Sequence, residues 1–272
     1  MFFLPQSYQD SVDALRSVFT RLNLVLDGEP FIRFKDSTFF KLCLQYWDVD
    51  GDGGITYTEG ETAMPSLPST AFRETRIVDA TDFKYLSWKP SNECPLFKDC
   101  TDLKYAAIKD GMYLLGEMFR NCISLERVDL PTTVLDYDSK GGRSFENCKS
   151  LKHITLPINK KIYATYYFQE SGLEELEFPD ATIEIGGYAC FKCGFLSEVT
   201  IGNGITVIGN AAFNSCPAMV SCYIKATTPP TITPYTFDNN NCNFYVPRAS
   251  VNAYKAATNW SKYASRIIGY DF

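Results

Sequence analysis

The side chains best placed for chemistry lie in one twelve-residue stretch, from Asp48 to Glu59. It reads D-V-D-G-D-G-G-I-T-Y-T-E, so an aspartate stands at every second position of its first half and a glutamate closes it. Alternate residues of a tight loop turn their side chains toward one centre. Carboxylate, carbonyl and hydroxyl oxygens around such a centre are the ligands that a hard cation such as Ca²⁺ prefers. The stretch therefore predicts one calcium site.

The stretch is a full match to the EF-hand loop pattern, D-x-D-x-D-G-x-I-x-x-x-E. Gly53 permits the sharp turn at position six, and Ile55 anchors the loop to the core. The alternative interpretation is a solvated acidic turn. Because the sequence shows no second loop of this kind, we expect calcium to act as a structural staple rather than as a switch. The predicted ligands are Asp48, Asp50, Asp52, Gly54, Thr56 and Glu59.

The residue types that catalysis needs do not assemble elsewhere in the sequence. His153 is the only histidine, so no second one can complete an acid–base or metal site. No serine lies in a G-x-S-x-G motif, and no glycine-rich phosphate loop is present. Cys190 and Cys193 have C-x-x-C spacing, but no second pair lies near them to make a zinc site. The sequence predicts a protein that is not an enzyme.

Most of the chain is a repeat. Seven phenylalanines recur at steps of 22 to 26 residues, and each of the first six is followed by a hexad with apolar residues at its first, fourth and sixth places. In stacked parallel coils these side chains point inward, and the third and fifth point to the open face of the sheet. The phenylalanines are Phe97, Phe119, Phe145, Phe168, Phe191, Phe213 and Phe237, and the hexads span residues 103–108, 125–130, 151–156, 173–178, 196–201 and 219–224.

The cysteines follow the same repeat. Four of the ten stand three residues after a repeat phenylalanine, and Cys193 stands two residues after Phe191. Equivalent positions of stacked coils lie at one level, so we expect a buried column of small apolar thiols. An occasional stacked pair could still be bridged, because neighbouring coils lie only about 4.8 Å apart. The four regular members are Cys100, Cys122, Cys148 and Cys216.

The stretch from Leu196 to Cys216, L-S-E-V-T-I-G-N-G-I-T-V-I-G-N-A-A-F-N-S-C, resembles the BspA-like leucine-rich repeat of bacterial surface proteins. That repeat reads roughly L-x-x-I-x-I-P-x-x-V-x-x-I-G-x-x-A-F-x-x-C. The resemblance covers residues 97 to 224. It implies an α+β fold in which short parallel strands stack in coils as a leucine-rich repeat solenoid. It also implies a single EF-hand-type loop on a helical segment ahead of the first repeat.

The flanking segments predict a cap at each end of the solenoid. Apolar spacing predicts a helix over residues 7–27 and a second helix that starts near Asp36 or Ser37 and feeds the acidic loop. After the repeats we expect a strand over 243–247, a helix from Ser250 to Ala264 capped by Ser250, and a last strand over 266–270. The predicted division is a helical cap at 1–72, the solenoid at 73–224 and an α/β cap at 225–272.

Composition excludes two classes of partner. The net charge is −6 and the pI is about 5.0, which disfavours nucleic acid because a phosphate-binding face needs clustered basic residues. No apolar run reaches the ~20 residues of a membrane span. The first residues lack the basic start and the long apolar stretch of a signal peptide, so none is visible in this sequence.

The outward positions of the hexads are the candidate binding surface, since solenoids use extended sheets to bind partners. We expect a non-enzymatic binding or adhesion module, secreted or on the cell surface, that recognises proteins or glycans of host or neighbouring cells. The alternatives are a structural or receptor-binding part of a larger extracellular or virion assembly, and a merely solvated face. The candidate partner-binding residues are Tyr105, Arg127, Asp129, His153, Glu175 and Tyr223.

Overall fold

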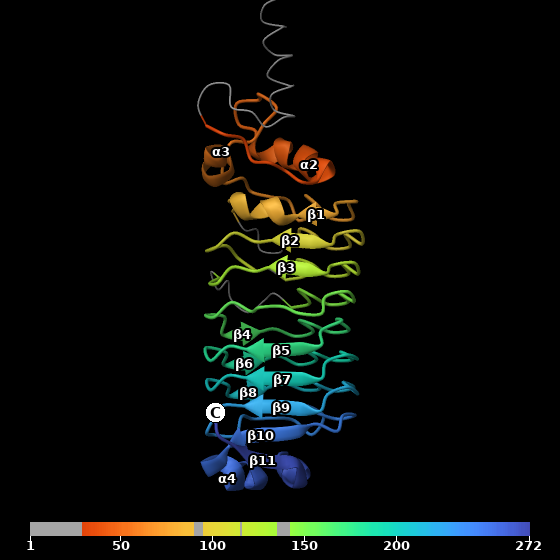
Figure 1. Cartoon of the computed structure of the whole chain (residues 1–272), viewed down its shortest axis with the longest axis vertical. Helices are drawn as coiled ribbons and strands as arrows, with labels where there is room; N and C mark the ends of the chain where they lie inside the picture. Colours follow the sequence, from red (N-terminus) through yellow and green to blue (C-terminus); the bar gives the residue numbers. More distant parts are fainter. Residues whose placement is uncertain (1–28, 90–94, 115, 135–141) are drawn as a thin grey trace, which may run out of the picture.

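The computed structural model describes residues 29–89, 95–114, 116–134 and 142–272. The chain is an elongated stack of coils with short helices at both ends (Figure 1). The helix predicted over residues 7–27 lies outside the described residues.

The hexads form the main row of parallel strands. Every paired hexad is in register with its neighbour, so that Glu175, Glu198 and Ser221 lie side by side in successive coils. The row consists of two sheets, in the orders β1-β2-β3 and β5-β7-β9-β10-β11. This confirms the predicted leucine-rich repeat solenoid of stacked parallel strands. The strands are β1 (Asp79–Ala80), β2 (Tyr105–Ala107), β3 (Arg127–Asp129), β5 (Glu175–Phe178), β7 (Glu198–Ile201), β9 (Ser221–Ile224), β10 (Asn243–Pro247) and β11 (Ile267–Tyr270).

In the described residues, three strands of two residues each form a second row beside the main row. β4 (Ile162–Tyr163), β6 (Glu184–Ile185) and β8 (Val207–Ile208) pair in parallel as a three-stranded sheet. Their second residues, Tyr163, Ile185 and Ile208, are buried and close the core from this side. In the coils of β6 and β8, apolar side chains are therefore enclosed between two parallel rows of backbone hydrogen bonds.

One hexad does not form its predicted strand. Within residues 151–156, the backbone of residues 153–156 makes no hydrogen bond to either neighbouring coil among the described residues. The residue just before this segment, Lys152, still pairs with the next coil, because its carbonyl accepts the Glu174 amide at 3.0 Å. The main row is therefore split between β3 and β5. A second exception is Ala107, predicted to face outward but buried, since its methyl group is the shortest side chain of the outward row.

The core is a stack of phenylalanine rings along the axis of the solenoid. The rings of Phe97, Phe119, Phe145 and Phe168 lie nearly parallel, with centroids 5.4 to 5.7 Å apart and interplanar angles of 2 to 14°. Phe72, which the repeat pattern missed, extends this stack by one coil at 5.2 Å. Phe213 and Phe237 continue it further along at 5.3 Å. We call these phenylalanine rings, together with the residue at the equivalent position of every other coil, the ring stack.

Phe191 was predicted to belong to the ring stack, and that prediction is wrong: Cys190 takes the position. The Cys190 amide donates to the next coil at 2.7 Å, as the Phe168 amide does one coil earlier. Residues with positive φ flank Cys190 on both sides, Tyr188 at 59° and Lys192 at 58°, and the same two-residue offset flanks Phe119. Phe191 is shifted by one place and turns partly to solvent.

The predicted thiol column is confirmed. Each of its cysteines donates from Sγ to the backbone carbonyl of the ring-stack residue in the preceding coil, at 2.9 to 3.1 Å. All nine described cysteines are buried and free of disulfides. The C-x-x-C pair is therefore part of this core, with Cys193 in the column and Cys190 in the ring stack. Burial raises the pKa of the Cys148 thiol well above its ordinary value, which keeps it protonated and able to donate.

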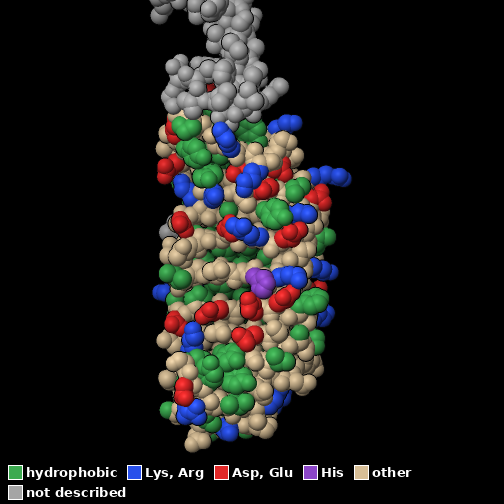
Figure 2. All heavy atoms as spheres, viewed as in Figure 1, with side chains coloured by type: hydrophobic (Ala, Val, Ile, Leu, Met, Phe, Trp, Pro, Cys, Tyr) green, Lys and Arg blue, Asp and Glu red, His purple; other side chains and the backbone are tan. Residues whose placement is uncertain are grey.

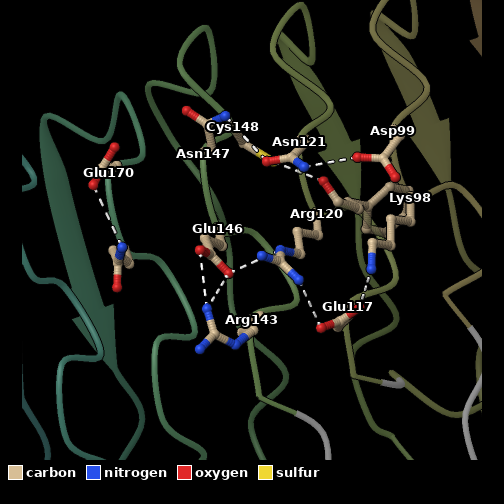
Figure 3. Close-up of polar contacts among 12 residues, drawn as sticks. Lys98, Asp99, Glu117, Arg120, Asn121, Arg143, Glu146, Asn147, Cys148 and Glu170 are labelled. Carbon is tan, nitrogen blue, oxygen red and sulfur yellow. Dashed lines mark hydrogen bonds and ion pairs between the residues drawn. The ribbon is translucent and has the colours of Figure 1, made fainter.

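A chain of ion pairs runs across three coils beside the ring stack (Figure 3). Lys98 contacts Glu117 at 2.6 Å, and Arg120 contacts Glu117 at 2.9 Å. Arg120 also reaches Glu146 at 3.1 Å, and Arg143 contacts Glu146 at 2.8 Å. Two carboxylates, Glu117 and Glu146, each lie between two cations, so this network links the three coils to one another.

Among the described residues, the N-terminal end of the stack carries two helices and a 3-10 turn. α2 (Ser37–Trp47) begins after Asp36, whose Oδ1 accepts the amides of Thr38 and Phe39, which confirms the predicted start. The acidic loop follows, then α3 (Tyr57–Thr62) and the 3-10 helix η1 (Thr81–Tyr85).

At the other end, the helix predicted from Ser250 to Ala264 is interrupted. The segment divides into η2 (Arg248–Ser250), α4 (Val251–Ala256) and η3 (Ser261–Arg266), and the Ser250 side chain makes no capping bond. The extended backbone at Ala257 lets Trp260 turn into the core, where its Nε1 donates to the Pro230 carbonyl at 2.8 Å. The predicted boundaries at residues 72 and 224 stay predictions, and the main sheet runs on through β10 and β11.

Candidate functional site

The acidic loop is held between two buried anchors. Trp47, the last residue of α2, is fully buried and donates from Nε1 to the Ser87 carbonyl at 2.9 Å. Ile55, near the end of the loop, is also fully buried. The residues between them are mostly exposed or half-buried. Core packing therefore fixes both ends of the loop and leaves its carboxylates at the surface.

The structure brings Asp48, Asp50 and Asp52 together. One carboxylate oxygen from each lies within 4.8 Å of the others. The tight path that allows this depends on Gly51 and Gly53, whose φ angles of +73° and +86° suit glycine. Backbone amides of the loop donate to Asp48 Oδ1 at 2.9 Å and to Asp48 Oδ2 at 3.1 Å. This donor set of clustered hard oxygens fits a calcium ion.

Electrostatics at the loop favour a bound cation. Partial burial raises the pKa of Asp48, and the neighbouring charges of Asp52 and Glu59 act in the same direction. The amides of Gly51 and Gly53 oppose this rise without cancelling it. Crowded carboxylates repel one another, and a divalent cation between them would remove that repulsion.

The structure gives Glu59 and Thr56 a further role that the loop pattern did not predict. Thr56 caps α3 by accepting the Glu59 amide at 3.1 Å, and Glu59 Oε2 accepts the Thr56 amide at 2.8 Å, which makes a capping box. Glu59 Oε1 accepts the Val49 amide at 2.9 Å. Glu59 thus joins the start of the loop to its end, and its role as a calcium ligand stays a prediction.

The far side of the loop pairs with an earlier segment of the chain. The Ile32 amide donates to the Ile55 carbonyl at 2.8 Å, and Phe31 forms an antiparallel bridge with Thr56. Gly54 lies directly against the Phe31 ring, where an added Cβ would come within 2.3 Å of it. Residues 31–32 therefore provide the backbone pairing partners of residues 55–56 at the end of the loop, and no second acidic loop is needed there. The Gly54 carbonyl as a ligand stays a prediction.

The candidate partner-binding residues of the first coils share one open face. Arg127 makes a two-pronged contact with Asp129 at 2.8 and 2.6 Å along the same strand. His153 Nδ1 lies 3.2 Å from Glu175 Oε1, and both side chains are about two-thirds exposed (62% and 67%). Tyr105 is exposed in β2, one coil before Arg127. These five residues form a charged strip across successive coils.

Tyr223 belongs to a different surface, farther along the same face. Its ring stacks on Tyr245 at 4.6 Å and contacts Tyr270 edge-on at 5.3 Å, and Phe272 packs against Tyr270 at 5.0 Å. Figure 2 shows hydrophobic side chains gathered over this end of the molecule. Sequence reasoning missed Tyr245 and Tyr270, because their place depends on β10 and β11 continuing the sheet. The signal that could have found Tyr245 was the alternation of inward and outward side chains along the strand predicted over residues 243–247.

A hollow of about 530 Å³ opens in the charged strip at the split in the main row. It lies between the unpaired segment of residues 153–156 and strands β5 and β7, and it was not predicted, because the sequence gives no sign that this hexad leaves the sheet. Its lining mixes apolar side chains with carboxylates: His153, Ile154, Thr155, Leu156, Ile158, Glu175, Leu176, Glu177, Pro179, Glu198 and Thr200.

Residues 61–141 and 117–244 match the profile of the BspA type leucine-rich repeat region, which occurs in six copies. The chain belongs to this BspA-type leucine-rich repeat family. The match runs over the ring stack, the second row of strands and the main row from β1 to β9. Proteins of this family are repeat modules of a protein-binding type and are typically surface-associated or secreted bacterial proteins. In the described part of this BspA-type chain, no helix combines the length and the apolar character needed to cross a bilayer.

Solved structures of leucine-rich repeat proteins resemble this BspA-type protein at a distance. One, from Bacteroides ovatus, is 20% identical and has a TM-score of 0.42, and the match covers 55% of this chain and 41% of that one. Another, from T. pallidum, is 20% identical and has a TM-score of 0.41, with 61% and 84% covered. The match thus spans less than half of the Bacteroides ovatus protein. No curated protein matches the sequence.

Proposed function

We propose that this BspA-type protein is a non-enzymatic binding module, secreted or on the cell surface, that recognises partners through the open face of its main row of strands. The observation that carries the proposal is the charged strip. Exposed residues of opposite charge and an aromatic ring follow one face over successive coils, and two of them, His153 and Glu175, line a hollow. The partners would be proteins or glycans on host or neighbouring cells.

The arrangement suits recognition better than catalysis. The strip spreads its charged groups across several coils, and His153 and Glu175 are largely open to solvent. An acid–base site is usually enclosed, so that burial and neighbouring charges can tune its groups. Extended mixed surfaces on a rigid scaffold are instead what solenoids offer to macromolecular partners.

We propose that calcium serves this module as a structural ion. Asp48, Asp50 and Asp52 would hold it, with Gly54, Thr56 and Glu59 completing the predicted ligand set. Because the loop joins α2 to α3 at the N-terminal end, a bound ion would stiffen the elements that cover the first coils there. The ion would neutralise the charge of the loop carboxylates and would take part in no reaction.

The proposal is tested by binding of the fluorescently labelled protein to cultured host cells and to a glycan array. We expect saturable binding that falls about tenfold or more in the triple variant Tyr105→Ala/Arg127→Ala/His153→Ala, because these side chains lie on the strip. The matched control is Lys161→Ala/Glu184→Ala, which removes two exposed side chains beside and within the second row of strands. Undiminished binding by the triple variant would refute the proposed surface.

A further inference from the structure

The hollow in the charged strip combines an apolar floor with an acidic rim. Leu156 and Leu176 are buried at 5% and 4% exposure, and Ile154 is half-buried beside them. Above this floor stand three glutamates on two adjacent strands, Glu175 and Glu177 on β5 and Glu198 on β7. In Figure 2, acidic side chains lie next to the histidine of the strip.

The rim is only partly neutralised by the protein itself. Glu175 faces His153 at 3.2 Å, and Glu177 contacts Lys225 at 3.2 Å. Glu198 has no ion pair among the described residues. Three carboxylates therefore face one lysine and one histidine, and the hollow has an excess of negative charge when the histidine is neutral.

The wall of the hollow also offers backbone groups. Residues 153–156 form no hydrogen bond to the flanking coils within the described ranges. Their amides and carbonyls are therefore not taken up by pairing within the main row of strands. A segment with free backbone groups at the side of a groove can pair with an extended peptide of a partner.

We propose that this hollow receives a lysine side chain from an extended segment of a partner protein. The aliphatic stem of the lysine would lie along Ile154, Leu156 and Leu176, and its ammonium group would reach the glutamates of the rim. The backbone of the partner segment would lie along residues 153–156. The inference rests on the proposed function, and it names the chemistry that the open face recognises.

The test uses the full-length protein and fluorescein-labelled octapeptides, with binding measured by fluorescence anisotropy. In one peptide lysine alternates with threonine, and in its counterpart norleucine replaces every lysine, which keeps the stem and removes the charge. We expect the lysine peptide to bind about tenfold or more tightly than the norleucine peptide. We also expect its affinity to fall as salt rises from 50 to 300 mM, on the scale set by the ~10 Å screening length.

The decisive variant is Glu175→Gln/Glu198→Gln, which keeps the shape of the rim and removes two charges. It should bind the lysine peptide about tenfold more weakly. Glu184→Gln, an exposed glutamate in the second row of strands, should bind it as the unaltered protein does. Equal affinities for the lysine and norleucine peptides, or unchanged binding by the double variant, would overturn the inference.

Failure of this inference can be separated from failure of the proposed function. If the lysine peptide does not bind, but the triple variant of the strip still loses cell binding, only the lysine pocket is wrong. If the peptide binds as expected while the triple variant keeps full cell binding, the hollow takes lysine but the strip is not the cell-binding surface.

Discussion

At the scale of single residues, the interruption of the ring stack at Cys190 shows how one small side chain is compensated by a large one. The sixth place of the other hexads is Ile or Leu, but the hexad that precedes Cys190 ends in Phe178. Its ring lies between the two halves of the stack, with centroids 6.5 Å from Phe168 and 6.3 Å from Phe213. Phe178 thus fills from the strand side the volume that a ring at position 190 would occupy.

This compensation predicts a strong coupling between the two positions. Cys190→Phe alone should lower the free energy of unfolding by about 1–3 kcal/mol, because the core is already full. Phe178→Leu alone should also destabilise, because it opens a cavity. In the double variant the new ring has room, so the loss should be smaller than the sum of the two by about 1 kcal/mol or more. Urea unfolding of all four proteins measures the coupling, and strictly additive losses would contradict it.

At the scale of elements, coils are joined by contacts that repeat from one to the next. In five coils the thiol column supplies a hydrogen bond to the carbonyl of the previous ring-stack residue. In the coil of Phe237, which has no cysteine at that place, Asn240 donates to the Phe213 carbonyl at 3.2 Å instead. The ion-pair chain adds charged contacts on the same side (Figure 3). Because each contact joins adjacent coils only, it aligns one coil with its neighbour and not with more distant coils.

The ion-pair chain predicts a pH-dependent stability. Partial burial acts to raise the pKa of Glu117, but the hydrogen bond and charge of Lys98, together with Arg120, lower it overall. A lowered pKa in the folded state gives stability above the unfolded value of about 4.3 that is lost as the pH falls through the folded value. Glu117→Gln should therefore lower the melting temperature more at pH 7 than at pH 3.

Thermal melts of the protein and the Glu117→Gln variant at several pH values make this measurement. Glu126→Gln is the control, since Glu126 and its partner Lys104 are both about half exposed (47% each) and 3.5 Å apart. Exposed pairs contribute little, so this control should change the melting temperature only slightly at any pH. A difference for Glu117→Gln that stays constant down to pH 3 would show that its charge does not matter.

The acidic loop with its two helices predicts a calcium-dependent melting temperature. For a Kd of about 10 µM, ~1 mM Ca²⁺ would add about 2.7 kcal/mol of stability. For a domain of this size that corresponds to a rise of about 5–10 °C over the melt with EDTA. Asp50→Asn should abolish the rise, since Asp50 is exposed and its hydrogen bond in the loop is the one it accepts from the Asp52 amide, which asparagine can also accept.

Differential scanning fluorimetry with Ca²⁺, Mg²⁺ and EDTA measures this effect. Asp180→Asn, which lies in a turn of the solenoid far along the chain and likewise accepts a backbone amide, is the matched control. If the unaltered protein melts at the same temperature with Ca²⁺ and with EDTA, the loop is a solvated acidic turn.

At the scale of the whole molecule, the fold is a one-dimensional array. Each coil pairs with the coil before it and the coil after it, and the buried tryptophans Trp47 and Trp260 mark its opposite ends. The stability of such an array is close to a sum of coil terms and interface terms. The effect of a stabilising change at one end should therefore decrease with distance along the stack.

This predicts a gradient in hydrogen exchange. Calcium should increase amide protection most in α2, α3 and the first coils, and least in β10, β11 and α4, because the loop contacts only the N-terminal end. Hydrogen exchange followed by mass spectrometry with and without Ca²⁺ measures the gradient, and Asp50→Asn should remove it. Equal protection at both ends would show that the stack unfolds as one unit.

The sequence by itself determined the solenoid, because its signal is repeated. The recurring ring and the three inward positions of each hexad predicted the coils, their parallel register and the thiol column, and the start of α2 was visible at Asp36. It also predicted that Asp48, Asp50 and Asp52 would meet, since the spacing within a short loop fixes which side chains converge.

Only the tertiary structure decided where the pattern fails. Whether Cys190 or Phe191 enters the core depends on the space that Phe178 leaves, and that space involves residues of two different coils. The loss of pairing at residues 153–156, and with it the hollow, depends on how one coil fits between its neighbours. A repeat pattern describes each coil alone. Packing between coils is a property of the stack, and it sets the surface on which the proposed function depends.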